Sequence, residues 1–311
     1  MGEKNIKHDK PLVSIGMPMY NGERYIRKAI DSLLAQDYEN FELIISDNAS
    51  TDSTLLICRE CTSSDHRVSV HAQNHNVGAL ANFKTVLEPA RGKYFMWAAV
   101  DDYWLPEFIS SLVKELEEHP EAGVAMCATE RVYEDGILFD TIRFKDKNDP
   151  NNMNYYQMIK GLTSPEKYNL YIYGLFRTNL LRQAISFYPE VPGLDRLFIC
   201  QIALATRFRY VDQVLHIRMH HDQPSNIRLA NEKFNRMQED KLVDIKILLA
   251  LRQMISKSTI IPWYRKLYMP VVLWRYAWLL LLGRVIPKIK DRVSPGSWNR
   301  LKKVKKLFLP D

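Results

Sequence analysis

The stretch LVSIGMPMYNGERYIRKAIDSLLAQDYENFELIISDNASTDST, residues 12–54, decides the fold of this chain. Its two short apolar runs, 12–17 and 41–46, each end at a turn signal and therefore predict strands. Between them, five apolar residues recur at the spacing of one helix face: Ile26, Ala29, Ile30, Leu33 and Leu34. A helix that connects two such strands predicts a parallel βαβ unit in a doubly wound α/β sheet. Ligands of such sheets bind at the carboxyl ends of the strands.

Further elements follow in the same alternating order. We expect helices over 53–61, 79–88, 106–119, 178–187 and 195–206, and strands over 68–73, 93–99, 123–129, 174–176, 208–211 and 214–218. Residues 130–170 have weak periodicity and predict a long, partly mobile insertion. From residue 227 onward the pattern is helical, with a break near Ile261 and Pro262. The chain thus divides into an α/β domain, residues 1–225, and a C-terminal helical appendage, residues 226–311.

The positive charge of the chain is concentrated near its C-terminus. The formal net charge is +7, and residues 241–311 hold 16 Lys and Arg against three Asp. Within this region, residues 267–283 are strongly apolar, but Pro270 and Arg275 interrupt them and leave no run long enough to span a bilayer. Tryptophans and basic residues around this segment predict contact with a membrane surface. The alternatives are a helical subdomain packed on the α/β domain or the interface of a homo-oligomer. Nucleic acid is not an expected partner, because no recognition motif accompanies the charge.

The cysteines raise the question of a metal site and of the cellular compartment. Cys58 and Cys61 form a C-x-x-C motif, with His71 and His75 downstream, so a zinc site has to be weighed. The spacing is short for a zinc finger, and residues 68–73 are expected to form a strand, so we favour two helix residues packed under the sheet. Four cysteines without a paired framework, and a polar N-terminus, lead us to expect a cytoplasmic protein, peripheral on the inner face of the cell membrane.

Asp101 and Asp102 are the sharpest chemical signal, because they follow the apolar strand expected over 93–99 directly. Two adjacent carboxylates repel each other unless a cation or hydrogen-bond donors neutralise them. Mg²⁺ and Mn²⁺ bind carboxylates of this kind together with substrate phosphates. The alternative is a helix N-terminus, where the helix dipole stabilises an aspartate. The polar loops expected at the same sheet edge favour a metal and phosphate site.

Five motifs taken together resemble the family 2 glycosyltransferases of the GT-A fold. They are PMYNGE at 18–23, SDNASTD at 46–52, NVG at 76–78, WAAVDD at 97–102 and DR at 195–196. The resemblance covers roughly residues 12–225 and is strongest to enzymes of bacterial surface-polysaccharide assembly. It implies an inverting, metal-dependent transfer of a sugar from a nucleotide-sugar donor to a saccharide acceptor, which we expect to be lipid-linked.

The resemblance also implies roles around the nucleotide. It assigns six residues to this part of the site: Pro18, Tyr20, Glu23, Asp47, Asn76 and Gly78. Asp47 would contact the base, and Gly78 would allow the backbone to approach the nucleotide closely.

The metal ligands follow from the same resemblance. Asp101 matches the second, metal-binding aspartate of the family's D-x-D motif, whereas Ala99 stands where the family has the first. Asp102, the next residue, is counted with the cofactor-binding residues and is expected to orient the loop. His220, in an Arg-x-His arrangement, is the expected second ligand of Mn²⁺ or Mg²⁺, the alternatives being a pyrophosphate hydrogen bond or a solvated histidine.

Asp195 is the expected catalytic residue, because an acidic residue at this position of the family resembles the general base that deprotonates the acceptor hydroxyl. Capping of the following helix is the alternative role. The family's usual Glu-Asp pair is reduced here to Leu194 and Asp195, so one carboxylate has to do the work. Two other functions stay open: a sugar-nucleotide nucleotidyltransferase, although residues 18–23 lack its glycine-rich basic loop, and a non-catalytic sugar-nucleotide-binding protein.

Overall fold

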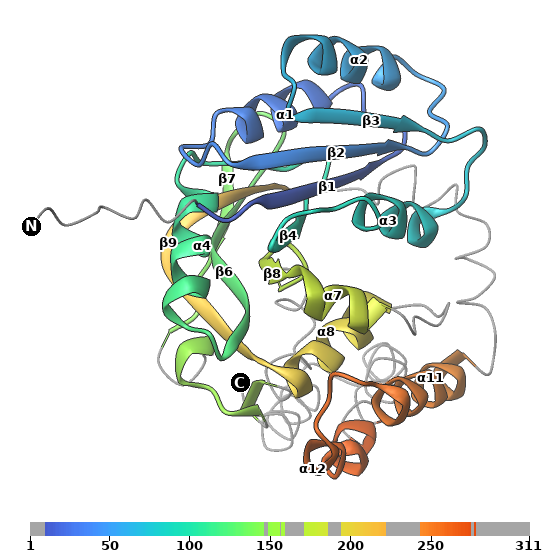
Figure 1. Ribbon diagram of the computed structural model, residues 1–311, viewed down its shortest axis with the longest axis vertical. Coiled ribbons are helices and arrows are strands. Elements are labelled where there is room, and N and C mark those ends of the chain that lie inside the picture. The colour runs from blue at the N-terminus through green and yellow to red at the C-terminus, as the bar shows by residue number, and fades with distance from the viewer. Residues whose placement is uncertain are drawn as a thin grey trace, which may run out of the picture.

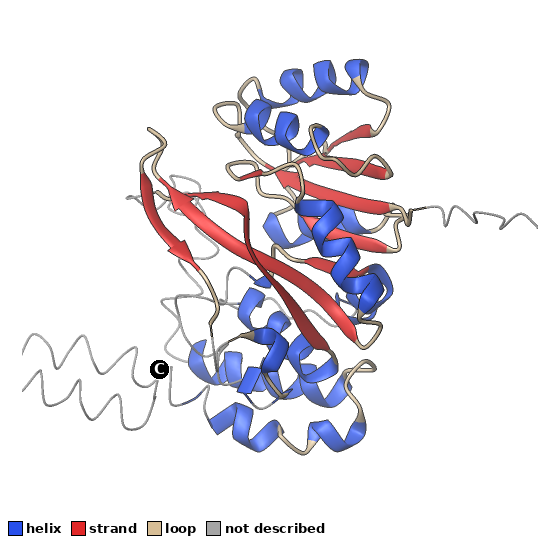
Figure 2. Cartoon of the chain, turned by 90° about the vertical axis from the view of Figure 1, so that its left-hand side faces the viewer, coloured by secondary structure: helices blue, strands red, loops and turns tan. Residues whose placement is uncertain are grey.

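A mixed, strongly twisted β-sheet runs through the protein and carries helices on both faces (Figures 1 and 2). The computed structural model describes residues 10–145, 149–155, 157–158, 171–185, 194–221, 243–274 and 277. The strands are β1 Val13–Met19, β2 Phe41–Asp47, β3 Val68–Ala72, β4 Tyr94–Trp97, β5 Tyr103–Trp104, β6 Ala122–Val132, β7 Leu138–Ile142, β8 Leu175–Arg177 and β9 Arg207–Met219. The helices are α1 Ile26–Leu34, α2 Thr54–Ser64, α3 Ala79–Leu87, α4 Phe108–Glu118, α7 Thr178–Ile185, α8 Leu194–Ala205, α11 Val243–Lys257 and α12 Trp263–Lys266, with a short 3₁₀ turn at Pro150–Asn152.

The strand order confirms the predicted fold class and adds a second, mixed half to the sheet. The order is β3-β2-β1-β4-β8-β6-β9-β5, with β7 paired to β6. Strands β3, β2, β1 and β4 are parallel, as the βαβ pattern predicts. Strand β8 lies between β4 and β6 and runs antiparallel to both, whereas β6 and β9 are parallel to each other. The carboxyl ends of β1, β2 and β4 therefore lie side by side, which is where the loops of the site begin.

Two sequence-based expectations about the second half are wrong. Residues 130–142 are not part of an irregular insertion, because β6 continues to Val132 and β7 pairs with it in a hairpin. The two short strands expected over 208–211 and 214–218 form one long strand, β9, whose pairing with β6 shifts register near Val211 and absorbs the polar residues between them. Residues 159–170, the rest of the expected insertion, lie outside the described part of the chain.

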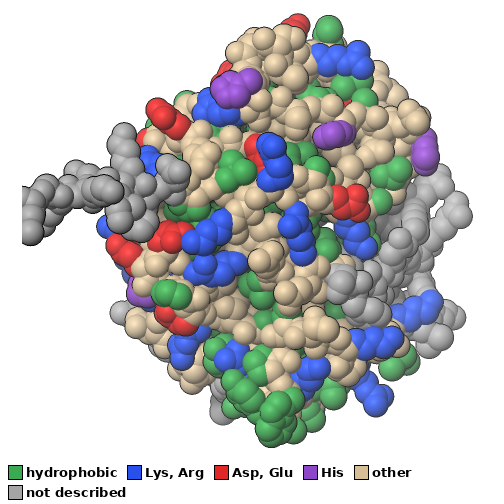
Figure 3. Space-filling view, viewed as in Figure 1, with side chains coloured by type: hydrophobic (Ala, Val, Ile, Leu, Met, Phe, Trp, Pro, Cys, Tyr) green, Lys and Arg blue, Asp and Glu red, His purple; other side chains and the backbone are tan. Residues whose placement is uncertain are grey.

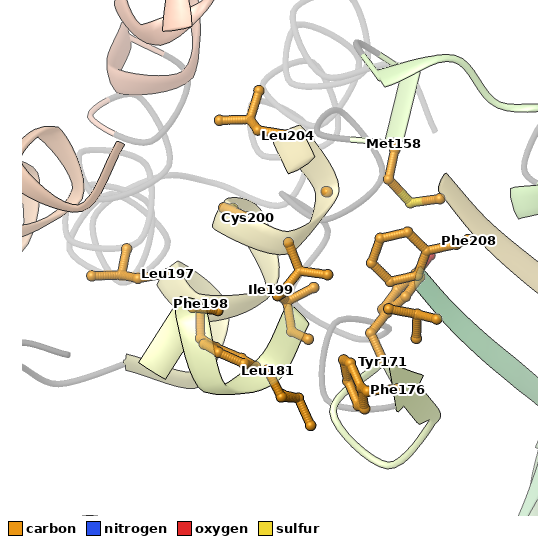
Figure 4. Packing of buried hydrophobic residues seen from close by; sticks show 14 of the residues in the cluster. Met158, Tyr171, Phe176, Leu181, Leu197, Phe198, Ile199, Cys200, Leu204 and Phe208 are labelled. Atoms are coloured by element: carbon orange, nitrogen blue, oxygen red, sulfur yellow. The ribbon is translucent and has the colours of Figure 1, made fainter. Parts of the chain in front are cut away.

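The alternating burial of the strands produces two cores, one on each face of the sheet. One contains β-strand residues together with the buried faces of α1, α2 and α4, including Ile26, Ala29, Ile30 and Leu33 as expected. The other contains residues of α3, α7, α8 and α11, and Figure 4 shows side chains of α8 within it, with Leu197 and Ile199 on opposite sides of the helix. Gly16 is required where the layers meet, since a Cβ there would lie 2.5 Å from Cζ of Phe95.

The helices after residue 242 pack on α8. Leu251, Met254 and Ile255 of α11 are buried in the same core as Phe198. Arg265 of α12 donates hydrogen bonds to the carbonyls of Leu204 and Ala205 at the end of α8. The predicted break near Ile261 and Pro262 is confirmed, because it separates α11 from α12. Across the described residues, every helix is too short or too polar to cross a bilayer.

Cys58 and Cys61 lie on the buried face of α2, as the helix interpretation expects. Burial raises the pKa of Cys58 to about 12, so its thiol stays protonated and is a poor metal ligand. His71 is exposed on β3, and the described residues contain no cluster of His, Cys, Asp or Glu that could hold zinc.

Candidate functional site

Reciprocal hydrogen bonds join the two loops at the carboxyl ends of β1 and β2. Asn21 and Ala49 both adopt positive φ angles, 50° and 58°, which non-glycine residues rarely do. The backbone N–H of Asn21 donates to Oγ of Ser50 at 2.9 Å, and the N–H of Thr51 donates back to Oδ1 of Asn21 at 2.8 Å. This reciprocal bonding holds both loops in the strained conformation and presents their backbone at the edge of the sheet.

Glu23 and Asp47, both predicted to line the nucleotide pocket, hold these loops in this structure. Oε2 of Glu23 accepts a hydrogen bond from the N–H of Ser53 at 2.9 Å. The carboxylate of Asp47 is buried and accepts hydrogen bonds from the backbone N–H and the hydroxyl of Ser50. Pro18 and Tyr20 are half-buried at the end of β1. The contact of Asp47 with the nucleotide base thus stays a prediction. In this structure its carboxylate accepts hydrogen bonds within the loop after β2.

Asn48, which the sequence analysis did not single out, connects the β2 loop to the loop at 76–78. Its Oδ1 accepts from the N–H of Val77 at 2.8 Å, and its Nδ2 donates to Oδ1 of Asn76 at 3.0 Å. Oδ1 of Asn76 also accepts from the N–H of Gly78 at 2.9 Å. Gly78 has a φ of +88°, and no atom lies within 4 Å of where its Cβ would be. The loop therefore leaves open space at the position predicted to face the nucleotide.

The end of β4 brings Asp101 to a histidine, but to His221 instead of the expected His220. Nε2 of His221 lies 2.9 Å from Oδ2 of Asp101, and the two side chains are 29% and 32% exposed. Burial and the neighbouring charge of Asp102 raise the pKa of Asp101, while the hydrogen bond to His221 lowers it. The ring of His220 is stacked on Phe139 of β7, with centroids 3.7 Å apart and planes at 8°. Adjacent histidines at the end of a strand point in different directions, and the sequence could not tell which one faces Asp101.

Asp102 is turned into the protein and anchors β9. Its Oδ2 lies 3.1 Å from Nε2 of His216, and its Oδ1 accepts from the N–H of Met219 at 3.1 Å. Nδ1 of His216 lies 3.3 Å from Oγ1 of Thr129, and its ring is stacked on Trp104. The expected role in orienting the loop agrees with these contacts, whereas the buried carboxylate does not face an open site.

The three carboxylates that the sequence analysis singled out, Asp101, Asp102 and Asp195, contribute to the electrostatic environment of Tyr173. Burial is the main cause that raises the pKa of its hydroxyl, and all three carboxylates raise it further. Asp195 itself is half-buried in the first turn of α8. The Tyr173 ring also lies 5.9 Å from the His216 ring and 5.6 Å from the Arg218 guanidinium. Charges at the start of α8 and at the end of β4 thus both act on the hydroxyl of Tyr173.

Hydrogen bonds near His221 connect the β6–β7 turn to the β1–α1 loop. Glu134 in this turn accepts hydrogen bonds from the guanidinium of Arg24 and the hydroxyl of Tyr25. The Tyr25 ring meets the His221 ring edge-on, with centroids 5.9 Å apart. Burial and Glu134 raise the pKa of Tyr25 to about 12, so it remains a neutral donor. Neither Tyr25 nor Glu134 carried a signal in the sequence, because their meeting depends on the β6–β7 hairpin.

The donor set of this edge fits a divalent metal with open positions. Asp101 supplies a carboxylate oxygen, and His221 supplies an imidazole nitrogen. The described residues hold no third acidic, His or Cys side chain grouped with these two. Mn²⁺ accepts both kinds of donor, whereas Mg²⁺ favours oxygen alone. Such a metal would complete its coordination with donor phosphates and water, as divalent ions in nucleotide sites do.

Comparison with known proteins was made through a family model and through individual relatives. Residues 14–183 match the model described as Glycosyl transferase family 2. The chain is 42% identical over 127 residues to an uncharacterized protein of Mycobacterium bovis, an alignment covering 40% of this chain and 37% of the relative. It is 32% identical over 114 residues to glycosyltransferase GlyA of Streptococcus pneumoniae, covering 37% of this chain and 16% of the relative. The aligned part thus spans well under half of either relative.

Solved structures share the fold at low sequence identity. The structure of Staphylococcus aureus TarS 1–349 in complex with UDP has a TM-score of 0.55 and 20% identity, over 88% of this chain and 91% of that one. A mannosyltransferase from Pyrobaculum calidifontis in complex with GDP-Man and Mn²⁺ has a TM-score of 0.52 and 17% identity, over 96% and 81%. These likenesses confirm the GT-A fold expected from the sequence.

Proposed function

The chain belongs to glycosyl transferase family 2, and from this premise we propose that it transfers a sugar from a nucleotide-sugar donor to a saccharide acceptor with inversion at the anomeric carbon. The family match favours sugar transfer over the nucleotidyltransferase alternative. The observation that carries the proposal is the contact of Asp101 with His221 at the carboxyl edge of the sheet, next to Tyr25 of the β1–α1 loop.

The proposed chemistry is a direct displacement. An acceptor hydroxyl oxygen forms the new bond to the anomeric carbon, and the bond from that carbon to the nucleotide diphosphate breaks. Asp195 takes the proton of the attacking hydroxyl, which requires its carboxylate within hydrogen-bond reach of the acceptor. Inversion follows if the hydroxyl attacks from the side opposite the leaving group. Support for this role of Asp195 comes from its position in the first turn of α8 and from the family resemblance at this position.

The donor half of the site is proposed at the loops that follow β1, β2 and β3. Their strained backbone and the open space at Gly78 suit close approach of a nucleotide. UDP and GDP-Man are bound by the related structures named above, which supports a nucleoside diphosphate sugar as donor here.

We further propose that Asp101 and His221 hold a Mn²⁺ ion, in preference to Mg²⁺. When bound, the ion supplies positive charge that stabilises the departing diphosphate. His220 is replaced in this role by His221, whose ring nitrogen contacts Asp101. Asp102 acts behind this pair through its bonds to His216 and Met219, and is not a ligand in this proposal.

For the acceptor we propose a lipid-linked saccharide in the assembly of a cell-surface polysaccharide. The proposal is supported by the basic and apolar C-terminal region, which suits work at a lipid surface. We retain residues 1–225 as the catalytic unit and 226–311 as the appendage.

The decisive experiment measures donor binding and sugar turnover separately. A panel of nucleotide sugars with Mn²⁺ is screened by thermal shift, and the donor that stabilises the protein is used for turnover. Asp195→Asn is expected to lose at least about a hundredfold of kcat, because general-base catalysis contributes on that order, while donor affinity stays unchanged. Asp212→Asn, an exposed aspartate on β9, is the matched control. Unchanged turnover in Asp195→Asn would remove this residue from the base role.

A further inference from the structure

Helix α12 and the residues after it expose a cluster of large apolar side chains. Trp263 is 77% exposed, Leu267 71% and Trp274 63%. Tyr264, Tyr268 and Val271 add to the same segment. We call these six residues the aromatic face. In Figure 3, hydrophobic side chains gather at the lower end of the molecule, where Figure 1 shows α12. Exposing so much aromatic surface to water costs free energy, so it points to a partner.

The segment is firmly attached to the rest of the protein through its other side. Val272 and Ile261 are 2% and 3% exposed and belong to the core around α8. The guanidinium of Arg265 donates to Leu204 and Ala205, and Nζ of Lys266 donates to the carbonyl of Ser256. The aromatic face is therefore held outward by a packed scaffold, and its exposure is not a consequence of a missing core.

The charge around the aromatic face selects the kind of partner. Residues 245–274 contain five basic residues and no Asp or Glu. Lys246, Arg252 and Lys257 are exposed on α11, whereas Arg265 and Lys266 donate to backbone carbonyls as described above. In Figure 3, Lys and Arg side chains border the apolar patch at the lower end. Protein–protein interfaces are depleted in lysine, whereas tryptophan, tyrosine and basic side chains together suit the boundary between lipid headgroups and acyl chains. The anionic leaflet also attracts such a surface electrostatically.

We propose that the aromatic face is a docking surface for an anionic lipid bilayer, with Trp263, Leu267 and Trp274 inserted at the headgroup boundary and the exposed basic residues of α11 contacting phosphate. This docking is a property of the α11–α12 scaffold and does not depend on the sugar-transfer proposal. The proposed surface comprises residues 263–274. It therefore begins before the apolar segment noted in the sequence, residues 267–283, and contains only the first part of that segment.

The test measures binding of the full chain to vesicles of equal parts phosphatidylglycerol and phosphatidylcholine, and to phosphatidylcholine alone, by co-sedimentation. The variant Trp263→Glu/Leu267→Glu is expected to lower the partition coefficient for the anionic vesicles at least about tenfold, because it replaces two inserted apolar groups with charges. The matched control is Leu56→Glu, whose side chain is 62% exposed on α2 at the opposite end of the molecule (Figure 1). Both variants should keep the melting temperature and the donor-induced thermal shift of the parent protein.

Four outcomes decide the proposal. Binding to anionic vesicles that is lost in the double variant, kept in Leu56→Glu and weakened by salt supports it. Equal binding of the double variant and the parent protein contradicts it, as does binding that is indifferent to anionic lipid. A parent protein that ignores vesicles but sediments as a dimer, with the double variant a monomer, assigns the face to a second copy of the chain and overturns the lipid proposal. None of these outcomes is measured by sugar transfer. A failure of the lipid-docking proposal therefore does not contradict the proposed glycosyltransferase activity.

Discussion

Asp102 and His216 form a buried pair, with Oδ2 of the aspartate 3.1 Å from Nε2 of the histidine. The same carboxylate accepts from the N–H of Met219, the last residue of β9. His221 follows two residues later and meets Asp101, the direct neighbour of Asp102. The two adjacent aspartates thus have different roles. Asp102 fixes the end of β9, and Asp101 contacts His221, which follows this strand.

Replacing Asp102 with Ala is expected to destabilise the protein by about 2–4 kcal/mol, because it leaves the buried His216 and the partly buried N–H of Met219 without their acceptor. Urea unfolding measures this change. Metal affinity of the folded variant, measured by calorimetry with Mn²⁺ and UDP, should also fall, since His221 loses its anchor. Asp102→Asn keeps the shape and one acceptor, and should recover part of both losses. If Asp102→Ala unfolds like the parent protein, the anchoring role is wrong.

The two adjacent histidines should behave differently. His221→Ala is expected to weaken Mn²⁺ binding at least about tenfold, because it removes one of the two side-chain donors at the site. His220→Ala removes a ring stacked on Phe139 and should change Mn²⁺ affinity far less. Calorimetric titration of Mn²⁺ into each variant, with UDP present, separates the two. The reverse ranking would return the ligand role to His220, as the sequence analysis expected.

Stability in mild acid should depend on Glu42. Burial would raise the pKa of Glu42, but hydrogen bonds from Ser14 and Arg91 outweigh it and hold the pKa below its usual range. A carboxylate with a depressed pKa contributes stability above its unfolded pKa of about 4.3, and loses it as the pH falls through the folded value. Glu42→Gln is expected to cost about 1 kcal/mol at pH 7, a modest figure because Arg91 is largely exposed. The cost should shrink below the unfolded pKa.

Urea unfolding of Glu42→Gln at a series of pH values checks this dependence. Glu39→Gln, at an exposed position in the loop before β2, is the control and should change stability little at any pH. A cost of Glu42→Gln that stays constant across the series would contradict the assigned hydrogen-bond network.

The four cysteines should be inert in the folded protein. All four are buried, and burial raises the pKa of both Cys58 and Cys127 to about 12. Ellman's reagent should therefore label none of them quickly until the protein is unfolded, because the thiolate is the reactive form. EDTA should leave the melting temperature of the protein as purified, without added Mn²⁺, unchanged. Rapid labelling of Cys58 or Cys61, or a melting temperature that falls with EDTA, would revive the zinc alternative.

Local patterns predicted the first half of the fold well. The helical spacing from Ile26 to Leu33 and the apolar runs on either side predict one βαβ unit, since a short crossover helix allows only parallel strands. The second half was less predictable from sequence. Strand β8 joins two strands distant in sequence, and β6 and β9 pair across about eighty residues, so no local periodicity records their register.

The sequence by itself determined the family and the first half of the sheet, and it supplied the residues of the proposed site: aspartates at the end of β4, an aspartate at the start of α8 and histidines after β9. Only the tertiary structure decided which of these side chains meet. Asp101 and Asp102 lie in the turn between β4 and β5, and His221 lies two residues beyond β9, so the contact of Asp101 with His221, and the burial of Asp102 against His216, depend on the register of β9 against β5 and β6. That register is set by long-range packing, which adjacent residues in a sequence do not encode.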